Sequence, residues 1–236
     1  MKKVYICGDS FGCSDPDYPG SSWSEQLNNF LSPDIKIINL SRVCASNLLI
    51  NLQVEQAIEQ NADYVIFMGT SVLRDEVKFS TVDNKQHLLI NRFVDITSKN
   101  NTLNQDLISY TMLNINTDFL SNFSGVLKEY SILKDIDLLI YKDKCIIENT
   151  LQKLVDSNIP FVFDQGGFEH PLYGKPVKKY FQKFKNYFSK LNLWDYASVR
   201  NFRPYHHIVD ETIIKEITEY HSELINKELE ITGTNK

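Results

Sequence analysis

The sequence predicts an α/β fold in which a central parallel β-sheet is covered by helices on both faces. Short apolar runs typical of buried strands occur near 3–7, 35–39, 64–68 and 159–163. The segments between these runs repeat apolar residues at helical spacing. Strands that alternate with helices form parallel sheets, because each crossover helix packs back onto the sheet.

A single domain over 1–236 accommodates this pattern, with an insertion at about 77–130 after the third strand. Within the insertion, 77–81 and 86–93 have the pattern of a hairpin around Asp83-Asn84, whereas 103–113 and 119–130 have helical spacing. An insertion at this place lies beside the crevice of such a sheet and would shape substrate choice. A role in oligomerisation is an equal alternative.

Helix boundaries are also marked in the sequence. Ser22 and Glu25 have the spacing of a capping box and precede an apolar face over about 23–31. Apolar residues at helical spacing also run from Ile136 to Asn158 and through the C-terminal segment that follows Asp210. These segments supply the helical layers of the predicted fold.

The composition narrows the class of protein. The net charge of −5 gives no support to binding a polyanion, so nucleic acid is not expected as a partner. No apolar stretch is long enough to span a bilayer, and the start at Met1 runs straight into the first strand without a signal peptide. The four cysteines show no Cys-x-x-Cys pair and no His at zinc spacing. We therefore expect a cytoplasmic protein with reduced thiols and no metal.

The first strand leads directly into Gly8-Asp9-Ser10-Phe11-Gly12. Small residues after a β-branched and aromatic run indicate a tight turn, which would hold Ser10 at the carboxyl edge of the sheet. Ligands of open α/β sheets bind in the crevice beyond that edge. A serine hydroxyl is well placed there for chemistry, and a purely structural strand-to-helix turn is the alternative interpretation.

The Gly8-Asp9-Ser10 block near the N-terminus resembles the first block of the SGNH, or GDSL-type, hydrolases, in which this serine is the nucleophile. The resemblance implies a three-layer α/β/α, flavodoxin-like sandwich. It also implies hydrolysis of an ester of a small acyl group or of a carbohydrate. No metal or organic cofactor is implied.

The loop after the second strand resembles the second block of that family, which ends Gly-x-Ser-Asn in one branch. Ser46 and Asn47 match this ending, while Cys44 occupies the glycine position. The glycine N–H of the family helps to form the oxyanion hole, and a backbone N–H survives replacement by cysteine where φ and ψ do not demand glycine. For Ser46 or Asn47, N-capping of the following helix is the alternative role.

The loop after the third strand lacks the family's Gly-x-Asn-Asp. It resembles instead a divergent branch, common among phage-encoded proteins, with Thr-x-x-x-Arg-x-Glu at this place, matched by Thr70, Arg74 and Glu76. Arg74 would stabilise an oxyanion or grip an anionic substrate. A surface pair of Arg74 with Glu76 or Asp75 is an equal alternative.

The last block of the family is Asp-x-x-His before the final helix, and His207 aligns best with its histidine. The aspartate position holds Pro204, so the usual orienting carboxylate is missing. A backbone carbonyl, Asp195 or Asp210 would have to orient the imidazole instead, because a serine needs a neutral imidazole held in one tautomer. The alternative is that His206 and His207 cap a helix or lie exposed.

The leading hypothesis is a serine esterase or acylhydrolase that acts on a small-molecule or carbohydrate ester. Ser10 is the nucleophile and His207 the general base, while the N–H groups of Ser10 and Cys44 and the Asn47 side chain bind the oxyanion. The supporting residues are Asp9, Thr70 and Arg74. Because two polar family residues are missing, the alternative is a catalytically silent module of the same fold that binds a glycan or protein partner.

Overall fold

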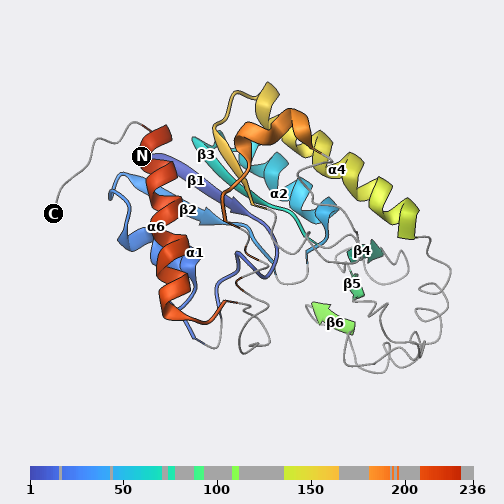
Figure 1. The fold of residues 1–236 in the computed structure, drawn as a ribbon, viewed down its shortest axis with the longest axis horizontal. Coiled ribbons are helices and arrows are strands. Elements are labelled where there is room, and N and C mark those ends of the chain that lie inside the picture. Colours follow the sequence, from blue (N-terminus) through green and yellow to red (C-terminus); the bar gives the residue numbers. More distant parts are fainter. Residues whose placement is uncertain are drawn as a thin grey trace.

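The computed structural model describes residues 1–15, 18–42, 45–70, 74–77, 88–92, 108–111, 136–164, 181–191, 193, 196 and 208–229. Residues 74–77, 88–92, 108–111 and 136 are described by their backbone. Across these ranges the chain forms the predicted α/β architecture, with helices on both sides of one central sheet (Figure 1).

The central sheet contains four parallel strands, β1 (Lys2–Cys7), β2 (Ile35–Asn39), β3 (Tyr64–Met68) and β7 (Phe161–Asp164). Their order is β2-β1-β3-β7, so the chain passes from β2 back across β1 to reach β3. The order therefore reverses between β1 and β3. In open α/β sheets the ligand crevice lies beyond the carboxyl ends of the strands at such a reversal.

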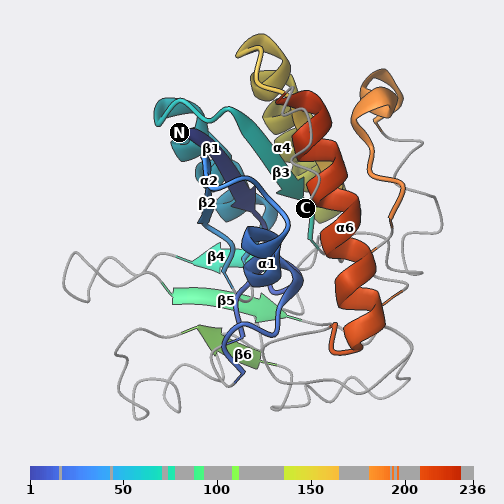
Figure 2. The same ribbon diagram turned by 90° about the vertical axis from the view of Figure 1, so that its left-hand side faces the viewer.

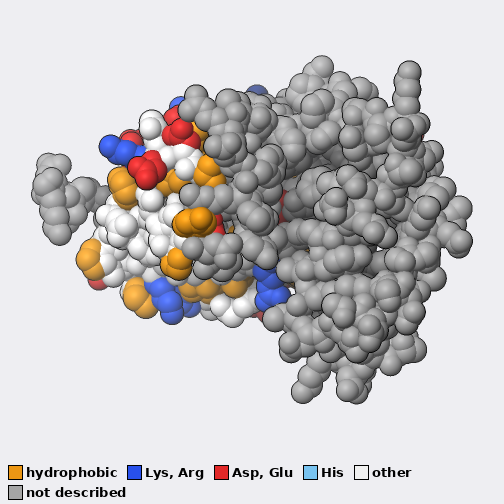
Figure 3. Space-filling view, turned by 90° about the horizontal axis from the view of Figure 1, so that it is seen from below, with side chains coloured by type: hydrophobic (Ala, Val, Ile, Leu, Met, Phe, Trp, Pro, Cys, Tyr) orange, Lys and Arg blue, Asp and Glu red, His pale blue; other side chains and the backbone are white. Residues whose placement is uncertain are grey.

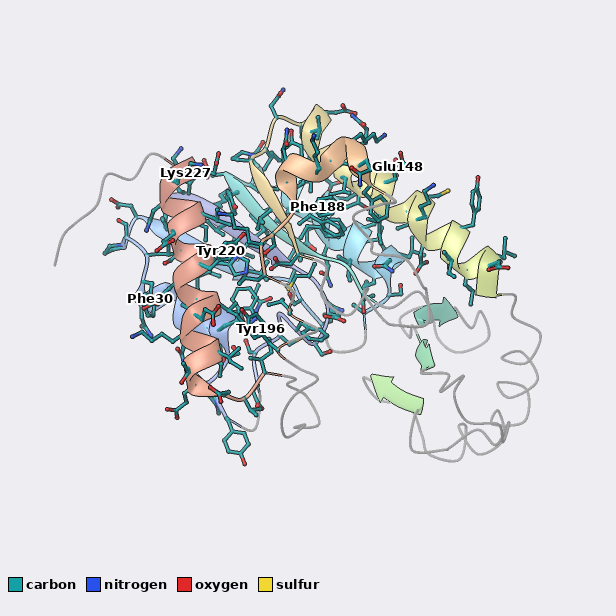
Figure 4. All side chains as sticks on the ribbon, in the orientation of Figure 1. Phe30, Glu148, Phe188, Tyr196, Tyr220 and Lys227 are labelled. Atoms are coloured by element: carbon teal, nitrogen blue, oxygen red, sulfur yellow. The ribbon has the colours of Figure 1, made fainter. Side chains whose placement is uncertain are left out.

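Helices α1 (Trp23–Gln26) and α6 (Glu211–Glu228) cover one face of the sheet, together with the 3₁₀ helix η1 (Leu27–Asn29) (Figures 1 and 2). Side chains that alternate along β1 and β3 pack under them, since successive strand residues point to opposite faces. Figure 4 shows Tyr220 between α6 and the sheet, where its hydroxyl oxygen accepts the Lys190 N–H at 2.9 Å. The main core residues of this face are Val4, Ile6, Trp23, Leu27, Ile66, Met68, Ile214, Ile217 and Ile225.

Helices α2 (Asn47–Glu59) and α4 (Ile136–Asp156) cover the opposite face, with the 3₁₀ helix η6 (Gln182–Tyr187) beside them. Both long helices lie where helical spacing predicted them. The residues of this second core are buried, and they include Tyr5, Cys7, Ile50, Val54, Val65, Phe67, Ile147, Leu151, Leu154 and Phe163. The fold is thus a three-layer α/β/α sandwich.

The predicted helix caps are present. Ser22 and Glu25 form the capping box of α1, although the helix continues past Gln26 only as a single 3₁₀ turn. The Ser46 Oγ caps α2 by accepting the Leu49 N–H at 3.2 Å. Asp210 caps α6, because its Oδ1 accepts N–H groups of the first turn at 2.9 and 3.3 Å.

A second, antiparallel sheet contains β4 (Arg74–Val77), β5 (Leu88–Arg92) and β6 (Ile108–Thr111) in that order. The antiparallel pairing of β4 with β5 corresponds to the predicted hairpin, and β5 lies within the expected 86–93. The first strand is displaced, because β4 overlaps the expected 77–81 only at Val77. The helix predicted over 103–113 is wrong at β6, because pairing with β5 satisfies this backbone as a strand. The helix predicted over 119–130 lies outside the described residues.

Charged side chains of both signs lie among hydrophobic ones on the described part of the face in Figure 3, without an extended region of one sign. Within the ranges that the structure describes, no helix is both long enough and apolar enough to cross a membrane.

Candidate active site

The loops after β1 and β3 leave the sheet side by side at the reversal of strand order. Cys7, the last residue of β1, pairs with Phe67 in β3. Asp9 and Ser10 therefore follow β1 at the same edge at which Thr70 follows β3. The sequence prediction placed both loops at this edge, and the strand register brings them into contact.

Gly8 begins the turn and is held from the α2 side. Its N–H donates to Gln53 Oε1 at 2.7 Å, and its carbonyl oxygen accepts from Gln53 Nε2 at 3.3 Å. A Cβ atom at this position would lie 2.6 Å from Met68 Cε and 2.9 Å from Met68 Cβ. Only glycine leaves room for Met68, so the path of the chain out of β1 is fixed.

Asp9 organises the turn that carries Ser10. Its side chain is fully buried, and Oδ2 accepts the Thr70 hydroxyl at 2.6 Å while Oδ1 accepts the Phe11 N–H at 3.0 Å. The Asp9 carbonyl oxygen accepts the Gly12 N–H at 3.1 Å, which closes a β-turn with Ser10 as its first central residue. The backbone on both sides of Ser10 is thereby fixed by hydrogen bonds.

The chain after Ser10 is anchored to α1 and to the end of β2. The Trp23 indole N–H donates to the Phe11 carbonyl oxygen at 2.7 Å, and Asn39 Nδ2 donates to the Gly12 carbonyl oxygen at 2.7 Å. Ser10 itself is buried, with 2% of its surface exposed. The serine lies in a preorganised loop rather than on a free surface turn.

Asn47 makes three hydrogen bonds within the protein. Its Oδ1 accepts the Thr70 N–H at 2.9 Å, while Nδ2 donates to the Thr70 carbonyl oxygen at 2.9 Å and to Asp143 Oδ2 at 2.7 Å. A carboxamide has two N–H donors, so both are in use. Through these bonds Asn47 holds Thr70 in place, and the oxyanion role expected of its side chain stays a prediction.

Asp143 on α4 was missed by the sequence analysis. It is 1% exposed, and the Lys142 ammonium lies 3.7 Å from its Oδ1. A signal was present, because Asp143 interrupts a row of buried apolar residues spaced four apart on α4, formed by Leu139, Ile147 and Leu151. A lone carboxylate in such a row needs a buried polar partner, and Asn47 supplies it.

Several predicted site residues have no described side chain. Cys44 and His207 lie outside the described residues, and Arg74 is described only by its backbone as the first residue of β4. The Oδ1 of Asp210, one of the groups considered for orienting His207, is engaged as the α6 cap. The structure thus brings together Asp9, Ser10, Asn47 and Thr70.

Cys7 lies just before the turn, but its environment disfavours a nucleophilic thiolate. Burial raises the pKa of its thiol well above the ordinary range. Among the described residues, no three His, Cys, Asp or Glu side chains gather as metal ligands would.

No family model matches the sequence, and no curated protein matches it. Among solved structures, the chain is similar to the psychrotrophic esterase EstA from Pseudoalteromonas sp., in a structure inhibited by monoethylphosphonate. The two are 13% identical, the match covers 98% of this chain and 100% of EstA, and the TM-score is 0.52. The chain is also similar to TesA, at 9% identity, with 96% and 99% coverage and a TM-score of 0.51.

Likeness at this level of identity establishes the fold. The chain has the α/β/α fold of these two proteins, over nearly its whole length, which confirms the architecture expected from the resemblance to SGNH hydrolases. The further assignment to a phage-like branch stays a prediction.

Proposed function

We propose that the protein is a serine hydrolase of the SGNH type that cleaves esters, with Ser10 as the nucleophile. One observation carries the proposal. The Asp9-Ser10 turn is held at the reversal of strand order by the Thr70 hydroxyl and by Gln53, which is how a reacting group is kept in one position. The fold shared with the esterase EstA supports the same reading.

In the proposed reaction, Ser10 Oγ attacks the ester carbonyl carbon while His207 accepts the hydroxyl proton. The backbone N–H groups of Ser10 and Cys44 stabilise the oxyanion. Collapse of the tetrahedral intermediate releases the alcohol, which takes its proton from His207, and leaves an acyl group on Ser10. Water, deprotonated by His207, then attacks the acyl carbon. The second tetrahedral intermediate collapses, Ser10 Oγ takes the proton from His207, and the carboxylic acid is released.

The proposed substrate is a small-molecule or carbohydrate ester with a small acyl group such as acetyl. The burial of Ser10, which is 2% exposed, favours a small acyl group over a bulky one. Asp9 and Thr70 act by fixing the turn, and Asn47 acts by fixing Thr70. Arg74 is proposed to bind the oxyanion or an anionic part of the substrate.

A second candidate is a catalytically silent module that binds a glycan or protein partner in the same crevice. The commitment of the Asn47 carboxamide to Thr70 and Asp143 favours it, because one expected oxyanion donor is used structurally. The family's loop asparagine and final aspartate are also missing from the sequence.

Labelling with a fluorophosphonate separates the two candidates. The wild-type protein, Ser10→Ala and His207→Ala are treated in parallel, folding is verified by circular dichroism, and labelled peptides are identified by mass spectrometry. Labelling at Ser10 that is lost in Ser10→Ala and strongly slowed in His207→Ala supports the hydrolase. Ser222→Ala, which removes a buried hydroxyl on α6, is the matched control. Folded wild-type protein that takes no label contradicts the proposal.

A further inference from the structure

We propose that Asp143 is a positioning residue for the Ser10 site. It acts from α4 by holding the Asn47 carboxamide that fixes Thr70, and through Thr70 it fixes Asp9 and the Ser10 turn. The inference rests on the proposed function, and it concerns a residue that lies 133 positions from Ser10 in the chain (143 − 10).

The contacts form a continuous series of buried hydrogen bonds. Asp143 Oδ2 accepts Asn47 Nδ2 at 2.7 Å, and Asn47 pairs with both backbone polar groups of Thr70 at 2.9 Å. The Thr70 hydroxyl then donates to Asp9 at 2.6 Å. All four side chains are 2% exposed or less, so water does not compete for these partners.

The acceptor oxygen of Asp143 and the Thr70 backbone together set the orientation of the Asn47 carboxamide. A carboxylate only accepts hydrogen bonds, so the group that faces it must be the Asn47 NH₂. The Asn47 Oδ1 is then directed toward the Thr70 N–H. A side-chain rotation of Asn47 would break the bond to a buried carboxylate, which is strongly unfavourable. Asp143 therefore restricts Asn47 to the conformation that clamps Thr70.

A second buried contact between α2 and α4 provides a matched control. The Thr150 hydroxyl contacts Asn51 Oδ1 at 2.9 Å and shares its one proton between this oxygen and the Ile146 carbonyl oxygen at 2.8 Å. Asn51 lies one helical turn beyond Asn47 on α2. Thr150 is as buried as Asp143 and joins the same two helices. Asn51 makes no hydrogen bond to the turn between Gly8 and Gly12 among those described. Loss of either contact loosens the helix pair, but only loss of Asp143 frees the clamp on Thr70.

The test measures saturation kinetics of fluorophosphonate labelling at Ser10 in Asp143→Leu, Asp143→Ala, Asp143→Asn and Thr150→Val. We expect the maximal labelling rate of Asp143→Leu and Asp143→Ala to fall by about tenfold or more, since small misplacements of a reacting group are costly. The concentration for half-maximal rate should stay within about twofold. Asp143→Asn keeps an acceptor for Asn47 and should restore most of the rate, and Thr150→Val should label like the wild type.

A wild-type rate in a folded Asp143→Leu or Asp143→Ala protein overturns the inference. Equal slowing by Thr150→Val also overturns it, because Asp143 would then contribute only to helix packing. The thermal midpoint of each variant is recorded so that rates are compared at temperatures where every protein is folded.

A measurement that does not depend on the reactivity of Ser10 separates this inference from the proposed function. Amide hydrogen exchange followed by NMR reports the Thr70 and Phe11 N–H groups, which the series protects. We expect exchange at both to accelerate at least about tenfold in Asp143→Leu, relative to amides of α6, and not in Thr150→Val. If the wild-type protein takes no label but exchange still accelerates in Asp143→Leu, the hydrolase is contradicted and the positioning role of Asp143 is supported. Unchanged exchange overturns the positioning role whatever the labelling result.

Discussion

Asp164, the last residue of β7, and His221 on α6 form a pair whose side chains are both fully excluded from solvent. Nε2 of His221 lies 3.0 Å from Asp164 Oδ2. The contact is close but lacks the alignment of a directed hydrogen bond. The imidazole stacks on Trp23, with ring centroids 4.8 Å apart, and meets the edge of Tyr220 at 5.3 Å. The pair fastens the final helix to the outer strand of the sheet.

Removal of His221 alone should destabilise the protein strongly. His221→Phe keeps a ring against Trp23 but leaves the Asp164 carboxyl buried without its partner, which costs about 1–3 kcal/mol. For a chain of this length, we expect the thermal midpoint to fall by about 2–12 °C. The double variant His221→Phe with Asp164→Leu should be more stable than His221→Phe. Additive losses in urea unfolding would show that the two residues are not coupled.

The bond between Thr70 and Asp9 should matter for both stability and labelling. Thr70→Val removes the donor at 2.6 Å from a buried carboxylate, and hydrogen bonds to charged groups contribute about 1.5–3 kcal/mol. We expect a loss of about 2 kcal/mol in the free energy of unfolding and a slower reaction of Ser10 with fluorophosphonate. Thr70→Ser keeps the donor and is the control. Equal behaviour of both variants would mean that the hydroxyl has no role.

The sheet was predictable because its strands are short, apolar and bounded by turn residues. The site was predictable only in part. Ser10 and Thr70 follow strands and could be placed at one edge, but the partners that reach them from α2 and α4 depend on how the helices pack. Asp143 and His221 each interrupt an apolar row of a helix, and that pattern gives no indication of which distant residue will pair with them.

The misassigned strand β6 shows another limit. Residues 103–113 have apolar positions at helical spacing, yet Ile108–Thr111 pairs with β5. A strand obtains its hydrogen bonds from a partner that is distant in sequence, whereas a helix obtains them locally. Local periodicity therefore favours a helix over a strand as short as the four residues of β6.

A methyl group at Gly8 should disturb the turn before Ser10. The added Cβ would lie 2.9 Å from Met68 Cβ, an atom that cannot swing away because it is bound to the β3 backbone. We expect Gly8→Ala to destabilise the protein by about 1–3 kcal/mol, as overpacking of cores does. Labelling at Ser10 should fall as well, even at temperatures where the variant is folded. A thermal midpoint and labelling rate equal to wild type would contradict this account of Gly8.

The described cysteines should differ sharply in reactivity. Cys145 on α4 is exposed, whereas Cys7 and Cys13 are buried. Burial also raises the pKa of the Cys7 thiol, so little reactive thiolate forms. Brief treatment with iodoacetamide at pH 8, followed by peptide mass mapping, should modify Cys145 and leave Cys7 intact. In urea, both cysteines should react. Modification of Cys7 in the folded protein at the same rate as Cys145 would contradict its buried position.

Tyr64 should make the protein less stable in alkali. The pKa of its phenol is raised above the ordinary value of about 10, mainly by burial and further by the negative charge of Asp164. Above that value the unfolded chain loses the proton while the folded protein keeps it, so unfolding releases a proton and stability falls as the pH rises. The contribution of Tyr64 is fully present below about pH 10 and is lost progressively above it.

Tyr64→Phe removes this proton release. Urea unfolding between pH 8 and pH 11 should therefore show a shallower loss of stability in the variant than in the wild type, by up to about 1.4 kcal/mol per pH unit above pH 10. Below that pH the two curves should run parallel, offset only by the effect of the lost hydroxyl. Part of the alkaline loss should persist in the variant, because the buried Cys7 thiol has a raised pKa and acts with the same sign. Curves that stay parallel up to pH 11 would show that Tyr64 ionises as readily in the folded protein as in the unfolded chain.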